Sequence, residues 1–169
     1  MATHRAVHVK SANAPPLELT EVETTSPPPP DHVRIAVNAC GVCGTDHAFV
    51  TGSFPNLTWP ITPGHEIAGT IAELGSGVEG FAVGDRVAVG WFGGNCNTCL
   101  PCRKGQFMQC VKLEVPSWNY PGGYVESVIV PPRTALARIP PDGLSFAEAA
   151  PPMGCAGVTT YNALRTTRA

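Results

Sequence analysis

Short stretches in which apolar and polar residues alternate recur along the chain and predict a mainly β structure. The clearest lies between residues 33 and 39, where every second residue is apolar and the residues between include Arg34 and Asn38. A strand with one buried face gives this period of two. Similar patterns and short apolar runs predict further strands at residues 5–9, 17–22, 67–74, 86–89, 124–130 and 135–139.

Signals for helices are few and lie mostly near the C-terminal end. Residues 45–50 are compatible with a short helix. Ser145 followed by Glu148 matches a capping box and predicts a helix through residue 150, and residues 154–168 are compatible with a second one. The predicted order is therefore strands first and helices last.

The composition narrows the class of protein. The chain has 169 residues, of which 43% are hydrophobic and 14% charged, which is too apolar for a disordered chain. Its net charge is -2 and it has no basic run, which argues against a nucleic-acid partner. No apolar stretch approaches the ~18 residues of a membrane span, and the N-terminus lacks the apolar core of a secretory signal. We therefore expect a cytoplasmic protein.

Four of the seven cysteines lie close together in a turn-rich segment, residues 93–112. They follow the spacing C-x2-C-x2-C-x7-C, which suits a tetrahedral Zn²⁺ site closed by four thiolates and therefore structural in role. The alternative is a set of reduced or disulfide-paired cysteines, for which the two-residue separations give poor geometry. The predicted ligands are Cys96, Cys99, Cys102 and Cys110.

The remaining cysteines are Cys40, Cys43 and Cys155, and each lies in a short motif. Cys40-Gly-Val-Cys43 taken alone resembles a redox dithiol, but the βαβ context that favours that interpretation is missing. Other motifs in the chain are Pro63-Gly-His-Glu66, Gly84-Asp-Arg-Val87 and Gly154-Cys-Ala-Gly-Val-Thr-Thr-Tyr161.

Taken together with Cys40-Gly-Val-Cys-Gly-Thr-Asp46 and the four-cysteine segment, these motifs resemble the zinc-dependent alcohol dehydrogenases of the medium-chain dehydrogenase/reductase superfamily. The resemblance runs along nearly the whole chain, with the motifs in the family's order. It implies a GroES-like, partly closed β barrel that carries a structural-zinc lobe at residues 93–112 and C-terminal helices.

The resemblance further implies that Cys43, His65 and Cys155 hold a catalytic zinc ion. Two thiolates and one imidazole leave the fourth position free for water or an alcohol. Such an ion stabilises an alkoxide, from which hydride passes to NAD or NADP. Taken singly, Cys43 is equally compatible with a buried small apolar residue and His65 with a structural histidine.

The resemblance also assigns roles to three neighbouring residues. Asp46 would orient the His65 imidazole, Glu66 would lie behind the zinc, and the Thr45 hydroxyl would take the proton of the alcohol. The alternatives are local backbone bonding for Asp46, a buried ion pair for Glu66 and helix capping for Thr45.

The substrate pocket is expected to include Trp91, with Phe54 and Trp59 adding to its wall or packing elsewhere. One departure from the family pattern concerns the proton relay. Relatives often carry a histidine two residues after the aspartate, where this chain has Ala48, and His47 lies one position early. The end of the relay is therefore left open.

The only G-x-G-x-x-G pattern, residues 75–80, leads into a turn and a strand instead of a helix, so it is not a dinucleotide-binding loop. We expect residues 1–150 to form the GroES-like catalytic domain and residues 151–169 to form a linking helix toward a dinucleotide-binding domain that this chain lacks. The Rossmann domain is thus predicted to be absent, and NAD or NADP to bind only with the missing domain.

Two further functions stay open on this evidence. One is a zinc-only hydrolase, lyase or isomerase on the same scaffold, because zinc-bound water is itself a nucleophile. The other is a non-catalytic module stabilised by zinc. For the dehydrogenase, we expect two zinc ions per chain, a small alcohol or aldehyde as substrate, and association into a homo-oligomer or through an exposed sheet edge.

Overall fold

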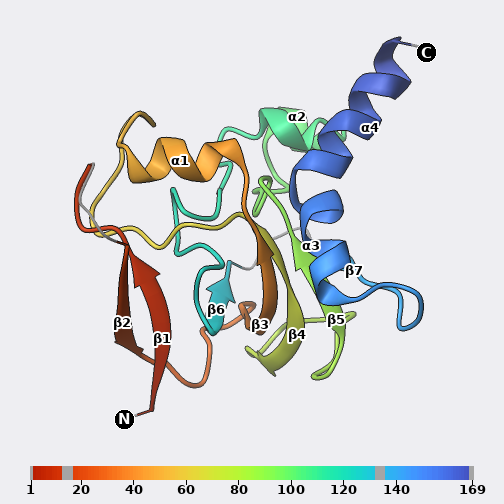
Figure 1. Ribbon diagram of the computed structural model, residues 1–169. Coiled ribbons are helices and arrows are strands. Elements are labelled where there is room, and N and C mark those ends of the chain that lie inside the picture. The colour runs from red at the N-terminus through yellow and green to blue at the C-terminus, as the bar shows by residue number, and fades with distance from the viewer. Residues whose placement is uncertain (1, 13–16, 132–135, 168–169) are drawn as a thin grey trace.

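The computed structural model describes residues 2–12, 17–131 and 136–167. Two antiparallel sheets form the body of the protein (Figure 1). The smaller pairs β1 (Thr3–His8) with β2 (Glu18–Glu23). The larger has the strand order β6-β3-β4-β5-β7, with β3 at Val33–Gly41, β4 at Glu66–Leu74, β5 at Arg86–Val89, β6 at Ser127–Val130 and β7 at Ala137–Arg138.

Strand β4 is buried on both faces over its first four residues, with the branched side chain of Ile67 on one face and the small one of Ala68 on the other. Ile67 and Ile71 join a core cluster with Ile35 of β3. Ala68, which points to the opposite face, packs against Ala149 of a C-terminal helix. Small residues on both surfaces let that helix lie close to the sheet.

The two longest helices follow the strands, whereas the shorter helical segments lie between strands. The helices are α1 (Gly44–Val50), α2 (Leu100–Arg103), α3 (Phe146–Gly154) and α4 (Ala156–Thr167), with a 3-10 turn η1 at Phe107–Gln109. Helix α3 covers the face of the sheet over β3, β4 and β5, whereas α4 points away from the body and buries no residue within its span (Figure 1). No helix in the described ranges is long and apolar enough to cross a membrane.

The prediction of a mainly β chain with helices at its C-terminal end is confirmed, and most predicted strands lie within one or two residues of their positions. The predicted strand at 124–130 is shorter, because Tyr124 forms a backbone hydrogen bond with Pro63 and the ladder with β3 begins only at Ser127. The prediction at 135–139 is met only by β7, and residue 135 lies outside the described residues, as does residue 168 of the last predicted helix.

The predicted end of the first C-terminal helix at residue 150 is wrong. Helix α3 continues to Gly154 through Pro151 and Pro152, and its start is fixed by the predicted capping box between Ser145 and Glu148. Each proline removes an N–H that would otherwise donate to the carbonyl four residues earlier, so the helix continues through them with the support of its packing on β3, β4 and β5. The helix therefore runs across the predicted division between residues 150 and 151. The short α2 and η1 were not predicted.

Candidate metal centres

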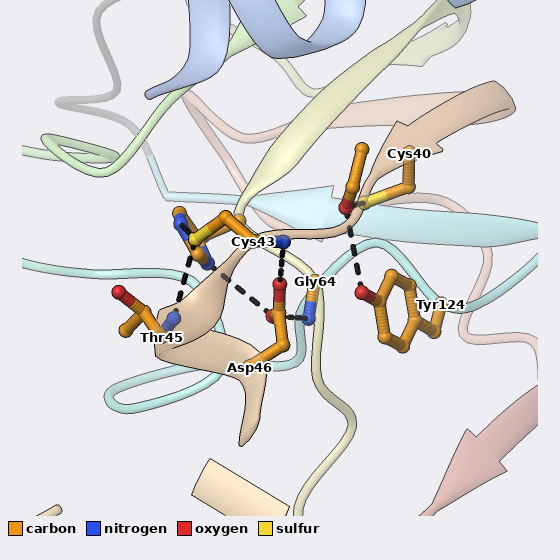
Figure 2. Close-up of polar contacts among 8 residues, drawn as sticks. Cys40, Cys43, Thr45, Asp46, Gly64 and Tyr124 are labelled. Carbon is orange, nitrogen blue, oxygen red and sulfur yellow. Dashed lines mark hydrogen bonds and ion pairs between the residues drawn. The ribbon is translucent and has the colours of Figure 1, made fainter. Parts of the chain in front are cut away.

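The first candidate ligand, Cys43, caps the N-terminus of helix α1. Its backbone N–H donates to Asp46 Oδ2 at 2.9 Å, and its Sγ accepts from the Thr45 N–H at 3.4 Å (Figure 2). The three-residue spacing between Cys43 and Asp46 is the one that a capping box requires. The free N–H groups at the start of the helix thus supply a hydrogen-bond donor to the Cys43 sulfur.

The second, His65, follows a tight turn just before β4. Gly64 has a φ of 100°, and a Cβ there would lie 2.7 Å from the ring of Tyr124, so only glycine fits. The Tyr124 N–H donates to Pro63 O at 2.9 Å and fixes the turn. His65 is fully buried, and its Nε2 lies 3.2 Å from Cys43 Sγ.

The third, Cys155, lies at the junction between α3 and α4. Its N–H donates to Pro151 O at 3.2 Å. The Trp91 N–H donates to Gly154 O at 3.1 Å, and a Cβ at Gly90 would come within 2.3 Å of the same oxygen. The two glycines therefore let the end of α3 lie against the end of β5, which places Cys155 beside the other two ligands.

These residues converge with Glu66 into one cluster. Cys43 Sγ, a ring nitrogen of His65, a carboxylate oxygen of Glu66 and Cys155 Sγ all lie within 4.8 Å of one another. A tetrahedral zinc ion with bonds of ~2.3 Å to sulfur and ~2.0 Å to nitrogen separates those two atoms by about 3.5 Å. The observed sulfur-to-nitrogen distance is 3.2 Å, so the donor set fits zinc.

The cluster also brings together acidic side chains whose ionised forms are costly to bury without a cation. Glu66 is 1% exposed, and its Oε1 has no hydrogen-bond partner among the described residues. Burial raises the pKa of Glu66. Burial and then the charge of Cys43 raise the pKa of Cys155. A bound cation would offset the cost of holding these anionic groups together.

Asp46 ties two of the ligand segments together. Besides the Cys43 N–H, its carboxylate accepts the Gly64 N–H at 3.1 Å, and its Oδ1 lies 3.4 Å from His65 Nδ1 (Figure 2). Burial opposes ionisation, but the nearby His65 ring and the hydrogen bonds from the Cys43 and Gly64 N–H groups outweigh it and lower the pKa of Asp46. An ionised Asp46 therefore faces the ring nitrogen of His65 that points away from Cys43.

The second cluster is formed by the sulfurs of Cys96, Cys99, Cys102 and Cys110, all within 4.8 Å of one another. Cys99 caps α2, with Pro101 in the first turn. Three backbone N–H groups donate to sulfur at 3.2–3.3 Å, those of Cys96, Cys99 and Lys112. Hydrogen bonds from Thr98 lower the pKa of Cys96 to about 5, whereas burial raises that of Cys102 to about 12. All seven cysteines are free, and this set fits a closed four-thiolate zinc site.

A pocket of about 670 Å³ opens beside the first cluster, and its walls include Thr45, Phe54, Trp91 and Cys155. The Trp91 ring stands edge-on to the His65 imidazole, with centroids 5.1 Å apart, and edge-on to Phe54 at 5.7 Å. Trp59, the third aromatic residue expected in the wall, is not among the lining residues of this pocket. It packs instead against the buried cluster of Val9, Phe49 and Ile61.

Several residues of this region were not predicted from the sequence. Met108 of the four-cysteine lobe and Thr159 of α4 line the pocket, and no local pattern marks them. Tyr124 donates to Gly41 O at 3.4 Å (Figure 2), and the preceding Gly122-Gly123 pair was a signal of close backbone approach.

Cys40 is outside both sulfur clusters, and burial raises its pKa to about 12. His47 is exposed and does not line the pocket.

Comparison with known proteins agrees with the arrangement of motifs. Residues 29–141 match the family model of the alcohol dehydrogenase GroES-like domain. The chain is 42% identical over 149 residues to alcohol dehydrogenase patD of Penicillium expansum, covering 88% of this chain and 42% of that protein. It is 41% identical over 157 residues to an alcohol dehydrogenase of Geobacillus stearothermophilus, covering 91% and 45%.

Solved structures give the same result. A cobalt and zinc bound thermostable alcohol dehydrogenase from Pyrobaculum aerophilum superposes with a TM-score of 0.85 at 30% identity, covering 97% of this chain and 49% of that one. The CAD from Helicobacter pylori complexed with NADP(H) has a TM-score of 0.85 at 27% identity, covering 99% and 49%. The chain thus spans less than half the length of each of these relatives.

Proposed function

The chain belongs to the zinc-dependent alcohol dehydrogenases of the medium-chain dehydrogenase/reductase superfamily, and we propose that it is the catalytic portion of an enzyme that transfers hydride from a small alcohol to NAD or NADP. The observation that carries the proposal is the convergence of Cys43, His65 and Cys155 beside an apolar pocket. In this proposal residues 1–150 form the catalytic domain, and residues 151–169 lead toward the part that binds the dinucleotide.

Each chain would hold two zinc ions. Cys96, Cys99, Cys102 and Cys110 would hold the structural ion, and Cys43, His65 and Cys155 the catalytic one. When bound there, the catalytic ion supplies a Lewis acid that makes the hydroxyl of an alcohol more acidic. With three protein ligands, its fourth position is available to the substrate.

The side chains around the pocket would orient the alcohol and take its proton. Thr45 lines the same pocket as Cys155, and its Oγ1 would accept the hydroxyl proton of the alcohol while its own proton passes to water. Trp91 and Phe54 form an apolar wall that excludes water and holds the carbon end of the substrate. Asp46 keeps the His65 ring in one orientation through the contact at Nδ1.

The test of this function is the activity of Thr45 variants in the zinc-loaded enzyme that contains this chain. We expect Thr45→Ala to lower the NAD(P)-linked oxidation of benzyl alcohol by about 100-fold, the usual effect of losing a general base. Thr45→Ser keeps the hydroxyl and should retain most of the activity, with zinc content equal in all three proteins. Equal turnover by Thr45→Ala and the parent would contradict the assigned role.

A second assay separates the dehydrogenase from a zinc-only enzyme. We expect oxidation of benzyl alcohol to depend on both NAD(P) and zinc, and to be lost in Cys43→Ala. Hydrolysis of a p-nitrophenyl ester that needs zinc but no dinucleotide, in a protein that oxidises no alcohol, would overturn the proposal.

A further inference from the structure

Gly41 lies directly opposite Glu66, where β3 ends and β4 begins. The two residues are partners in the antiparallel register, so their side-chain positions face each other across the ladder. A Cβ at position 41 would lie 1.9 Å from Glu66 Oε2 and 3.0 Å from Glu66 Cβ. Two carbon side chains directly opposite on neighbouring strands usually keep their Cβ atoms ~4.5–5.5 Å apart. The carboxylate of Glu66 therefore occupies the space that a side chain at position 41 would fill.

A second glycine closes the other side of this space. A Cβ at Gly154, the last residue of α3, would lie 2.6 Å from Glu66 Cα, 2.8 Å from its Cβ and 3.1 Å from its Cγ. Gly41 faces the carboxylate end of Glu66, and Gly154 faces the base of the same side chain. Together the two glycines leave a narrow slot that the Glu66 side chain fills.

The slot determines where the Glu66 carboxylate lies. Its Oε1 is buried without a hydrogen-bond partner among the described residues, and the carboxylate is within 4.8 Å of the ligand atoms of Cys43, His65 and Cys155. A buried carboxylate with an unpaired oxygen stays in such a place only if it has no room elsewhere or a cation to face.

We propose that Gly41 is a positioning residue of the metal centre, whose missing side chain gives the Glu66 carboxylate its place beside the three metal ligands. This inference rests on the proposed function only in taking those three residues as ligands. Gly41 has no positive φ, so its backbone conformation suits any residue, and space is the reason for glycine here.

An added methyl group at position 41 would displace the carboxylate. Non-bonded atoms need about 3.5 Å, so Oε2 has to move by roughly 1.5 Å from a Cβ at 1.9 Å. The backbone of Gly154 blocks the base of the side chain from shifting with it. The displaced Glu66 carboxylate therefore changes its position relative to the three metal ligands, and the effect should be measurable at the metal.

The experiment measures Co²⁺ in place of zinc in the full chain. We expect Gly41→Ala to change the visible absorption bands of Co²⁺ bound at the Cys43 site. The same substitution should lower the affinity of this site for Co²⁺ by about 10-fold, the usual effect of changing a residue that supports metal ligands. The four-sulfur site gives the same background in every variant. Gly44→Ala is the matched control, because a Cβ there meets nothing within 4 Å and Gly44 lies in the same segment.

The decisive comparison is made in a Glu66→Gly background. If Gly41 acts through Glu66, Gly41→Ala should add less than a twofold change there, because the three atoms nearest an added Cβ all belong to the Glu66 side chain. A Gly41→Ala effect of the same size with and without Glu66, or an equal effect of Gly44→Ala, would overturn the inference. Because these readouts use metal alone, they succeed or fail independently of alcohol oxidation.

Discussion

Replacing Asp46 by alanine tests whether one carboxylate holds two metal-ligand segments together. Asp46 accepts the N–H groups of Cys43 and Gly64, and its Oδ1 faces His65. Alanine leaves both N–H groups without an acceptor and removes the partner of the imidazole. The side chain is 4% exposed, so water has little access to take its place.

The size of the effect follows from these contacts. A buried donor left without a partner costs about 1–3 kcal/mol, and the two donors together should cost about 3 kcal/mol of unfolding free energy. Loss of the residue that orients a ligand imidazole lowers metal affinity by about 10–100-fold. The two effects are separable, because stability is measured with zinc saturating and affinity with zinc limiting.

The assays are urea unfolding of the zinc-loaded protein and competition for zinc with a chromogenic chelator. The matched control is Glu148→Ala, because Glu148 forms the same capping-box contacts with Ser145 at the exposed start of α3, and its loss should cost less stability than the loss of Asp46 without changing zinc affinity. If Asp46→Ala costs no more than Glu148→Ala and binds zinc like the parent, the reasoning about Asp46 is refuted.

Two other expectations concern the remaining cysteines. Cys99→Ser should lower the zinc content by one ion per chain and make residues 93–112 sensitive to limited proteolysis, because little apolar surface holds that lobe together. Cys43→Ala should also lose one ion yet leave the lobe resistant, and a resistant lobe in Cys99→Ser would count against its dependence on metal. Cys40 should resist iodoacetamide at pH 8 in the folded protein, since burial raises its pKa to about 12 and leaves almost no thiolate. Labelling at the rate of a free thiol, measured by mass spectrometry, would show that Cys40 is more accessible than the structure indicates.

Strands β2 and β6 could be predicted because more buried and less buried residues alternate along them, so a period of two is visible in the sequence. The alternation from Val33 to Ala39 lies in β3, which pairs with β4 on one side and with β6 on the other. Prediction failed where a tertiary contact replaced a local one, as at Tyr124, which bonds to the turn before His65 and delays the start of β6. It also failed at Pro151, because prolines usually end helices but packing on the sheet carries α3 past it.

The candidate site was predictable in part for a similar reason. Cys43 and Asp46 are close in sequence because a capping box fixes their spacing, so their relation is visible locally. Met108 and Thr159 line the pocket because the four-cysteine lobe and α4 lie beside it. The hydrophobic pattern of the sequence does not predict where these two segments lie. The slot for Glu66 was invisible for the same reason, since Gly41 faces it only once β3 and β4 have paired.

The position of Cys155 at the break between α3 and α4 would give the proposed ion a mechanical role. An ion shared by residues 43 and 155 would act as a cross-link that closes a loop of roughly 110 residues, and a covalent link of that length would remove about 4–5 kcal/mol of entropy from the unfolded chain. In the proposed site, metal binding would therefore couple the first third of the polypeptide to its C-terminal helices. In the apoprotein those helices should be the first to exchange their amide protons, well before the strands beneath them.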